Sequence, residues 1–144
     1  MHLQSKIWVN QDIEQVTKFF YDLTTLPKWD RSVAAVIPTS QTPGRVGATF
    51  ETIAPSGMKM NYRVIEFDSD RSVKILLTNS RMFKRAVWQF RFDSEKDGTQ
   101  ISCHIYFTLR FQYLFLYPVL YFNRKALTRD LNFLKTALNN NYAL

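Results

Sequence analysis

Cysteine and histidine are scarce in this chain of 144 residues. Cys103 is the only cysteine, so the sequence excludes both an internal disulfide and a cysteine metal cluster. With His2 and His104 as the only histidines, zinc chemistry is almost excluded as well. We therefore expect no metal, no other cofactor, and a reducing, cytoplasmic location.

Long apolar runs are missing too. The most apolar stretch, residues 111–122, is shorter than the roughly 20 residues that span a bilayer, and Pro118 interrupts it. The N-terminal residues, MHLQSKIWVN, lack the charged-then-apolar pattern of a signal peptide. The sequence therefore predicts neither a membrane anchor nor export.

Acidic residues are fewer than basic ones, 12 against 19, so the formal net charge is +7. A positive balance suits nucleic acid, an anionic membrane or an anionic ligand, and it also favours solubility. The basic residues are scattered, and only Lys84-Arg85 and Arg124-Lys125 are adjacent. Because the chain has no basic run, we favour the solubility interpretation and expect no nucleic-acid partner.

Aromatic residues are abundant, at 15% of the chain. Rings supply large apolar surface with few rotatable bonds, so they suit either a thick core or the walls of a ligand cavity. The hydrophobic share of 46% and the length are typical of one globular domain. We expect that domain to cover residues 1–144.

The N-terminal part predicts one strand and two short helices. A cap at Asn10 or Asp12 precedes apolar residues that recur at helical spacing. Pro27 is expected to end that helix, because proline disfavours helix in the residue before it. The predicted elements are a strand over residues 3–9, a helix that ends at about Thr25 and a helical turn over residues 28–33.

Short strands separated by turn signals follow. The turns, such as Pro55-Ser56-Gly57 and Lys96-Asp97-Gly98, are too short for parallel crossovers, so they predict an antiparallel meander. Within the strands apolar and polar residues alternate, as Trp88 and Phe90 do with Gln89. One face of the sheet is therefore apolar and needs a cover. The predicted strands cover residues 35–39, 46–53, 58–67, 72–78, 86–92 and 100–111.

A long C-terminal helix is predicted to supply that cover. It begins after Pro118, and its leucines at positions 127, 131, 134 and 138 form an apolar stripe. A helix of about 20 residues is about 30 Å long, which matches a strongly curved sheet. Asn123 interrupts the stripe, so we expect a buried amide that needs a hydrogen-bond partner from protein, water or ligand.

The order of these segments resembles the START-like helix-grip proteins (the SRPBCC superfamily), and most closely their polyketide cyclase/dehydrase-like branch. The similarity extends over nearly the whole chain. The matching segments are Val9-Asn10-Gln11, Asp22-Leu23, Leu26-Pro27-Lys28-Trp29-Asp30, Gly44-Arg45-Val46-Gly47, Tyr62-Arg63-Val64-Ile65-Glu66-Phe67-Asp68 and Asp97-Gly98-Thr99.

The resemblance implies an α+β helix-grip fold, in which a curved antiparallel sheet of six or seven strands wraps around the C-terminal helix. It also implies an elongated cavity between sheet and helix for lipids, sterols, polyketides or other apolar molecules. Some members are enzymes, but the family shares no universal catalytic motif. We therefore assign no catalytic residue, because a fold does not define a reaction.

The expected ligand-binding residues are apolar or aromatic side chains of the inner face and two residues of the last helix. The same rings could instead fill a solid core, and we favour a cavity because one helix rarely fills so wide a sheet. Binding of an apolar or amphipathic molecule is the leading hypothesis, and a cyclase- or dehydratase-like enzyme is the alternative. The candidates are Phe50, Met60, Tyr62, Trp88, Phe90, Phe107, Asn123 and Leu127.

Few titratable groups are predicted to face inwards. Tyr62 could orient a carbonyl or act as a general acid, although an ordinary core tyrosine explains it better. Alternation places His104 on the wet face and Cys103 among the buried residues. The aspartates at positions 22, 30 and 130 are interpreted as caps and salt-bridge partners. Trp29 is expected to seat a short helix on the sheet.

Residues 111–125 allow two interpretations. Exposed rings followed by Arg124-Lys125 would suit transient contact with a membrane surface or a partner chain. Alternatively, the rings are the buried first turn of the C-terminal helix. The sequence favours neither.

Overall fold

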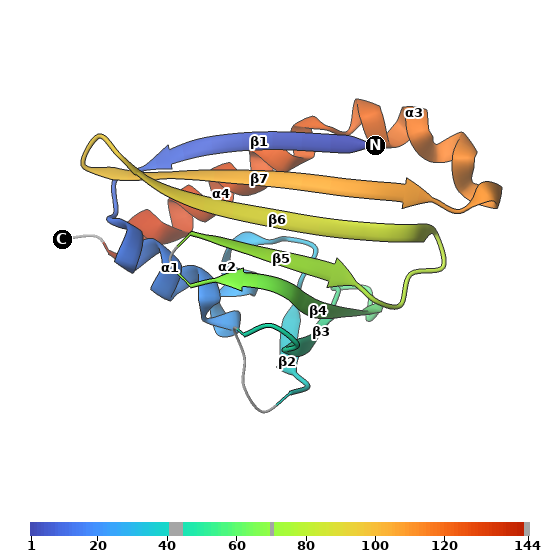
Figure 1. Ribbon diagram of the computed structural model, residues 1–144, viewed down its shortest axis with the longest axis horizontal. Coiled ribbons are helices and arrows are strands. Elements are labelled where there is room, and N and C mark those ends of the chain that lie inside the picture. Colours follow the sequence, from blue (N-terminus) through green and yellow to red (C-terminus); the bar gives the residue numbers. More distant parts are fainter. Residues whose placement is uncertain (41–44, 70, 143–144) are drawn as a thin grey trace.

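The computed structural model describes residues 1–40, 45–69 and 71–142. Within these residues seven strands form one antiparallel sheet in the order β1-β7-β6-β5-β4-β3-β2 (Figure 1). The predicted helix-grip fold is confirmed. The strands are β1 (His2–Val9), β2 (Ala35–Pro38), β3 (Thr49–Ile53), β4 (Lys59–Asp68), β5 (Ser72–Leu77), β6 (Phe83–Glu95) and β7 (Gly98–Leu109).

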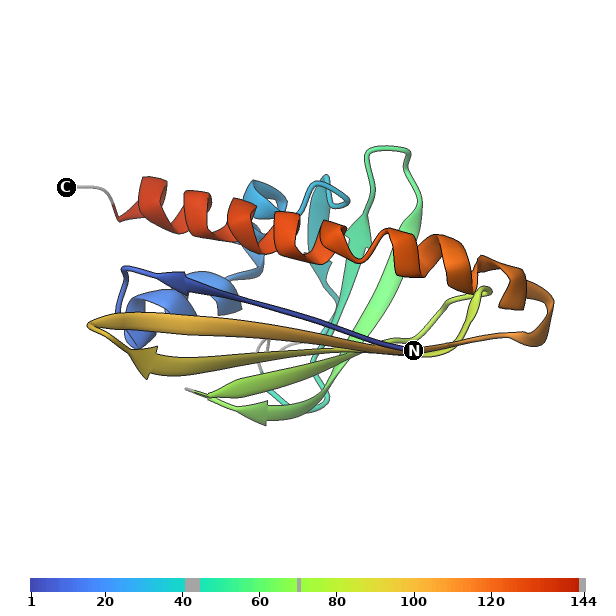
Figure 2. The same cartoon turned by 90° about the horizontal axis from the view of Figure 1, so that it is seen from above.

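Strands β2 to β7 form a meander, and the N-terminal strand β1 pairs with β7 as the edge strand. Ile7 of β1 lies opposite Ile101 of β7, far away in the sequence. β3 and β4 turn up from the plane of β1, β7 and β6 towards the helical layer (Figure 2). A register shift between Val64 and Glu66 of β4 adds to the bend, since bulges increase local twist. The sheet therefore has a concave inner face.

Two of the predicted turns form as expected. Gly57 has φ of +88° and closes the β3–β4 hairpin, where its N–H donates to the carbonyl of Ala54 at 2.8 Å. Lys96 and Asp97 carry the positive φ values of the β6–β7 turn. Gly44, one of the residues on which the family resemblance was based, lies outside the described residues.

The predicted helix up to Thr25 is shorter than expected. α1 (Ile13–Tyr21) begins at a capping box of Asp12 and Gln15 and ends at Asp22, whose backbone is extended. The Asp22 side chain caps the next turn, η1 (Leu23–Thr25), a 3₁₀ helix, and α2 (Leu26–Trp29) follows directly. Pro27 lies in the first turn of α2, where its missing N–H costs nothing, so it begins a helix rather than ending one.

The predicted continuous C-terminal helix is also wrong in detail. The chain forms a 3₁₀ segment, η2 (Phe111–Leu116), then α3 (Tyr117–Phe122) and finally α4 (Lys125–Asn141). The interruption falls at Asn123, whose backbone leaves the helical region at φ −88° and ψ 10°. In the described part of the chain, no helix is long and apolar enough to cross a membrane.

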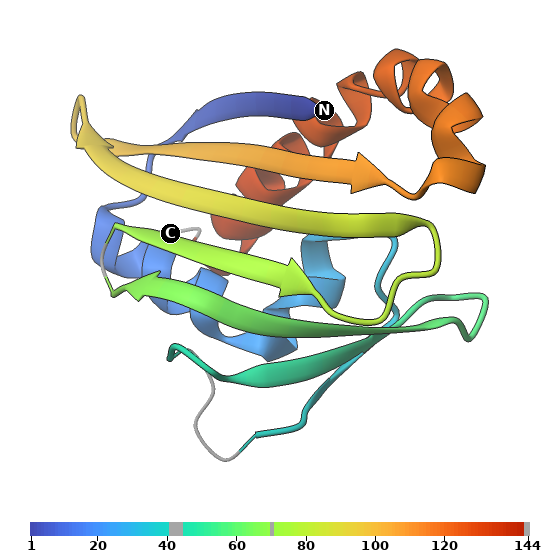
Figure 3. The same cartoon turned by 45° about the vertical axis from the view of Figure 1, so that its right-hand side comes forward.

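α4 covers the inner face and packs on β1 and α2, while α3 lies over the far end of the sheet and η2 forms the turn that leads to it (Figure 2). Leu131, Leu134 and Leu138 of α4 are essentially inaccessible to solvent. They pack with Phe92 of β6 and Ile101 of β7 in the larger of two hydrophobic clusters. α1 and α2 complete that layer on the same side of the sheet as α4 (Figure 3).

The second hydrophobic cluster lies where α3 joins the sheet. Leu77, Ala86, Phe107 and Leu109 are its buried members. The half-buried Tyr117 of α3 packs against them, and its hydroxyl accepts a 3.2 Å hydrogen bond from the backbone N–H of Leu109. The two ends of the sheet interior are thus solidly packed.

Candidate functional site

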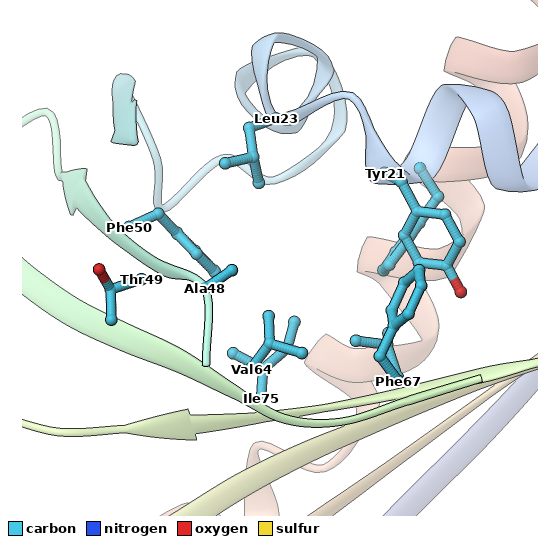
Figure 4. A pocket seen from close by; sticks show the side chains of 10 residues that line it. Tyr21, Leu23, Ala48, Thr49, Phe50, Val64, Phe67 and Ile75 are labelled. Carbon is cyan, nitrogen blue, oxygen red and sulfur yellow. The ribbon is translucent and has the colours of Figure 1, made fainter. Parts of the chain in front are cut away.

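The helical layer does not fill the whole inner face of the sheet. A small pocket of about 40 Å³ lies between the α1–η1 segment and strands β3 to β5 (Figure 4). Figure 4 shows Leu23 of η1, Phe50 of β3, and Val64 and Ile75 of the sheet around this space. The full lining is Phe20, Tyr21, Leu23, Ala48, Thr49, Phe50, Val64, Phe67, Val73 and Ile75.

Next to it lies a larger space of about 270 Å³, which we call the central cavity. It shares Phe20, Leu23, Phe50 and Ile75 with the small pocket, so the two spaces adjoin. Its volume is close to the lower limit for small-molecule sites, about 300 Å³. The lining residues are Phe20, Leu23, Leu26, Trp29, Asp30, Ser32, Val33, Phe50, Thr52, Tyr62, Ile75, Trp88, Phe90 and Asp130.

A third space of about 260 Å³ lies under the α3–α4 junction, and we call it the helix-side cavity. Five residues line both this space and the central cavity: Trp29, Asp30, Trp88, Phe90 and Asp130. The remaining lining residues are Leu3, Ile105, Leu120, Asn123, Ala126, Leu127 and Leu131. The two cavities therefore share a wall and together extend beneath the helical layer.

Phe50 and Tyr62 line the central cavity from neighbouring strands. Burial raises the pKa of Tyr62 to about 12, the charge of Asp30 adds to the rise, and a hydrogen bond with Thr52 opposes it. The phenol is therefore protonated at neutral pH. It can donate a hydrogen bond to a ligand oxygen, whereas it is too weak an acid to transfer its proton readily.

Trp88 and Phe90 follow each other on the inner face of β6 and line both cavities. Trp88 meets the Tyr62 ring edge to face, with centroids 5.8 Å apart. Phe90 meets Trp29 of α2 in the same way, at 6.3 Å. Rings from the sheet and from the helical layer thus form a continuous aromatic wall.

Met60 and Phe107 lie outside the two cavities, although alternation places them on the same face as the other candidates. Both belong to the second hydrophobic cluster. The Phe107 ring is flanked by Phe83 at 5.5 Å and by Tyr117 at 6.2 Å. Phe107 is therefore part of a packed core, which is the alternative that the sequence analysis gave for these rings.

Leu127 and Asn123 line the helix-side cavity from α4 and from the α3–α4 junction. Leu127 is buried, as its place in the apolar stripe predicts. The expectation of a buried amide at Asn123 is wrong, because Asn123 is exposed. It ends α3, where a residue that tolerates non-helical backbone is favourable, and its side chain borders the cavity from the solvent side.

Asp30 and Asp130 are the site residues that the sequence analysis missed. The Asp30 side chain stabilises a turn and does not cap a helix: its Oδ1 accepts hydrogen bonds from the N–H and hydroxyl of Ser32, at 3.0 and 2.6 Å. Asp130, however, projects from α4 to the same cavity wall. Burial raises its pKa, and the charge of Asp30 raises it further. No motif links these two aspartates in the sequence, so only the fold reveals the pair.

Trp29 also has a larger role than the sequence analysis assigned to it. It is 6% exposed, lines both cavities and packs against Phe90, so it seats α2 on the sheet and forms part of the wall. Its indole Nε1 is buried and has no hydrogen-bond partner within the described residues. An unused donor therefore lies in the layer that forms the wall.

The remaining titratable candidates lie as alternation predicts. Cys103 is fully buried, and burial raises the pKa of its thiol. His104 faces away from the cavities, and its Nδ1 lies 2.9 Å from Nε2 of His2 on the neighbouring strand. Burial and the charges of His2 and Arg91 lower the pKa of His104. Neither residue lines either cavity.

Solved structures of the same fold cover almost the entire chain. TTHA0849 from Thermus thermophilus matches with a TM-score of 0.79 and 16% identity, over 99% of this chain and 100% of the other. A START superfamily protein from Mycobacterium smegmatis gives 0.73 and 14%, over 97% and 95%. Norcoclaurine synthase from Thalictrum flavum, a point mutant with a transition state analogue, gives 0.76 and 9%, over 99% and 96%.

Of the two sequence comparisons, one identifies a family. No curated protein matches the chain. The family model described as "Polyketide cyclase / dehydrase and lipid transport" matches residues 1–139. Its match confirms the resemblance inferred from the order of the sequence segments. The chain belongs to the polyketide cyclase/dehydrase and lipid transport family, with the START-like helix-grip fold.

Proposed function

We propose that this protein binds an apolar or amphipathic small molecule, of lipid, polyketide or aromatic type, in the central and helix-side cavities. The supporting observation is that two adjoining spaces of about 270 and 260 Å³ lie between the inner face of the sheet and the helical layer. Aromatic rings line these spaces, as in most small-molecule sites. The proposed contacts are Phe50, Tyr62, Trp88, Phe90 and Leu127, with Asn123 at the rim.

Native mass spectrometry of protein purified from its own host tests this proposal directly. We expect a co-purified small molecule on the wild type. Two cavity-filling variants, Val33→Phe for the central cavity and Ala126→Phe for the helix-side cavity, should lose it, because both side chains line the spaces. Thr136→Phe on the exposed side of α4 is the matched control. Equal retention by all variants would show that the molecule binds elsewhere.

A cyclase- or dehydratase-like enzyme is the second candidate function. One observation favours it: two carboxyl groups, those of Asp30 and Asp130, line one cavity, and the pKa of Asp130 is raised. A carboxyl group with a raised pKa can exchange protons nearer to neutral pH. If the protein is such an enzyme, we expect wild-type protein to change the mass of the co-purified molecule and Asp130→Asn to leave it unchanged. A carrier would leave the mass unchanged with both proteins.

We also propose transient contact of residues 111–125 with an anionic membrane surface. The exposed fractions of Phe111, Phe115 and Phe122 are 86%, 71% and 76%. From Gly98 to Arg129 the sequence contains no acidic residue, while Arg110, Arg124 and Lys125 border the rings. Exposed rings beside basic residues suit the interface of an anionic bilayer.

The position of α3 relates this surface to the cavities. Leu120 of α3 lines the helix-side cavity, whereas Val119 and Tyr121 of the same helix are half exposed. One helix therefore forms cavity wall on one side and apolar surface on the other. A ligand could exchange with a bilayer at this end of the sheet.

Vesicle co-sedimentation tests the membrane contact. We expect wild-type protein to pellet with vesicles that contain phosphatidylglycerol and to remain in solution with phosphatidylcholine alone. Phe115→Ser with Phe122→Ser should abolish pelleting, while Val46→Ser with Met58→Ser, at exposed apolar positions elsewhere, should not. Failure of the wild type to pellet with anionic vesicles would exclude the contact. A cytoplasmic location and the lack of a nucleic-acid partner stay predictions from composition.

A further inference from the structure

The charged residues that line the cavities are all acidic. Asp30 and Asp130 line both the central and the helix-side cavity, and no lysine, arginine or histidine is among the lining residues that the structure describes. The chain as a whole has a net charge of +7. The cavity wall thus has the opposite sign to the protein, and the overall charge does not predict what binds inside.

Neither carboxylate forms an ion pair within the described residues, although the charge of Arg129 acts on its neighbour Asp130. The ion pair found among residues 1–40, 45–69 and 71–142 joins Lys74 to Glu66 on the sheet, at 3.3 Å. Arg31, the residue after Asp30, lies over the ring of Phe133, with Cζ 4.1 Å from the centroid. Burial raises the pKa of Asp130 most, repulsion by the charge of Asp30 raises it further, and the charge of Arg129 lowers it. A bound cation would relieve that repulsion.

The aromatic part of the shared wall suits the same kind of group. Trp29, Trp88 and Phe90 line both cavities beside the two carboxylates. Ring faces attract cations, tryptophan most strongly, and aromatic cages are a common site for ammonium groups. The Nε1–H of Trp29, a residue of the same wall, is buried and unpartnered within the described residues. The wall thus combines two carboxyl groups, three aromatic side chains and one unpartnered donor.

We propose that the ligand is an apolar amine: its protonated nitrogen lies between Asp30 and Asp130, and its apolar part extends along Trp88 and Phe90. This inference rests on the proposed binding function and adds the ligand's charge to it. It predicts that a molecule of the same shape binds more weakly when a carboxylate replaces the amine, because Asp30 and Asp130 would repel the negative charge.

Three probes with one chain length test the charge. We would measure the binding of n-octylamine, n-octanol and n-octanoate to the full chain by calorimetry at neutral pH and below their aggregation limits. We expect octylamine to bind at least about tenfold more tightly than octanol, and octanoate more weakly than both. Asp30→Asn and Asp130→Asn preserve shape and remove charge, so each should reduce the preference for the amine. Asp93→Asn on the exposed face of β6 is the charge-matched control.

The outcomes separate the two proposals. The inference is supported if wild-type protein prefers the amine, if Asp30→Asn and Asp130→Asn lose that preference, and if Asp93→Asn keeps it. If octanol or octanoate binds as tightly as octylamine, the amine inference is wrong while the binding function stands. If none of the three probes binds and no molecule co-purifies with the protein, both the amine inference and the proposed binding function are wrong. Comparison of the probes on wild-type protein needs no variant, so a misfolded variant leaves the test intact.

Discussion

Phe50 and Tyr62 lie directly opposite each other on β3 and β4, and their rings stack with centroids 5.2 Å apart and planes 17° from parallel. The pair lines the central cavity near the aromatic wall. Cross-strand ring pairs stabilise a sheet by roughly 0.2–1 kcal/mol. Here the same contact also holds the Tyr62 phenol in an apolar environment, which has consequences for the pH dependence of stability.

The raised pKa of Tyr62 predicts a loss of stability at alkaline pH. Folding favours the protonated phenol, so its contribution is complete below the usual pKa of 10 and is lost as pH rises towards about 12. We expect the wild type to lose more unfolding free energy than Tyr62→Phe over this interval. Urea unfolding at each pH measures the difference, with Tyr106→Phe on the outer face as control. Parallel profiles for all three proteins would contradict the prediction.

Cys103 is predicted to be unreactive in the folded protein. Its side chain is inaccessible to solvent, and burial and the charge of Asp130 raise the pKa of its thiol, so little thiolate forms. We expect a thiol reagent such as dithionitrobenzoate to label Cys103 only after denaturation. Ser94→Cys places a thiol at an exposed position and should be labelled at once. Rapid labelling of the folded wild type would refute this.

Gly98→Ala is expected to destabilise the fold. An added Cβ would overlap the carbonyl oxygen of Val9 and would lie 2.6 Å from Cζ2 of Trp8, so β1 or the Trp8 ring must move. Overpacking of this kind costs about 1–3 kcal/mol. Thermal or urea unfolding measures the loss, and the exposed Ser94→Ala on the same hairpin should be nearly neutral. Equal stability of the two variants would show that β1 adjusts freely.

Two leucines of α4 should respond differently to truncation. Leu134 is fully buried in the larger cluster, so Leu134→Ala should cost about 2–5 kcal/mol of unfolding free energy. Leu127 borders the helix-side cavity and is 8% exposed, so Leu127→Ala should cost less. Chemical unfolding of both variants provides the comparison. A larger loss for Leu127→Ala would show that the region around the cavity is as tightly packed as the core.

The breaks in the helices show where local pattern is insufficient. The spacing of apolar residues correctly predicts α1 and α4, because burial of one helix face depends only on that period. The ends at Asp22 and Asn123 depend on backbone geometry and on what each segment packs against. Tyr117 and Leu120 of α3 pack on the second cluster, so α3 and α4 cover different parts of the sheet.

The amino-acid sequence by itself determined the antiparallel meander, the apolar inner face and the covering helix. Each of these follows from the period of hydrophobic residues and from short turns, which are local properties. Tertiary structure alone decided that Trp88 borders a cavity while Phe107, on the same face, fills a core, because the helices above them pack at different places. It also brought Asp30 and Asp130 to one wall, since such a contact depends on how α2 and α4 pack and not on any spacing in the chain.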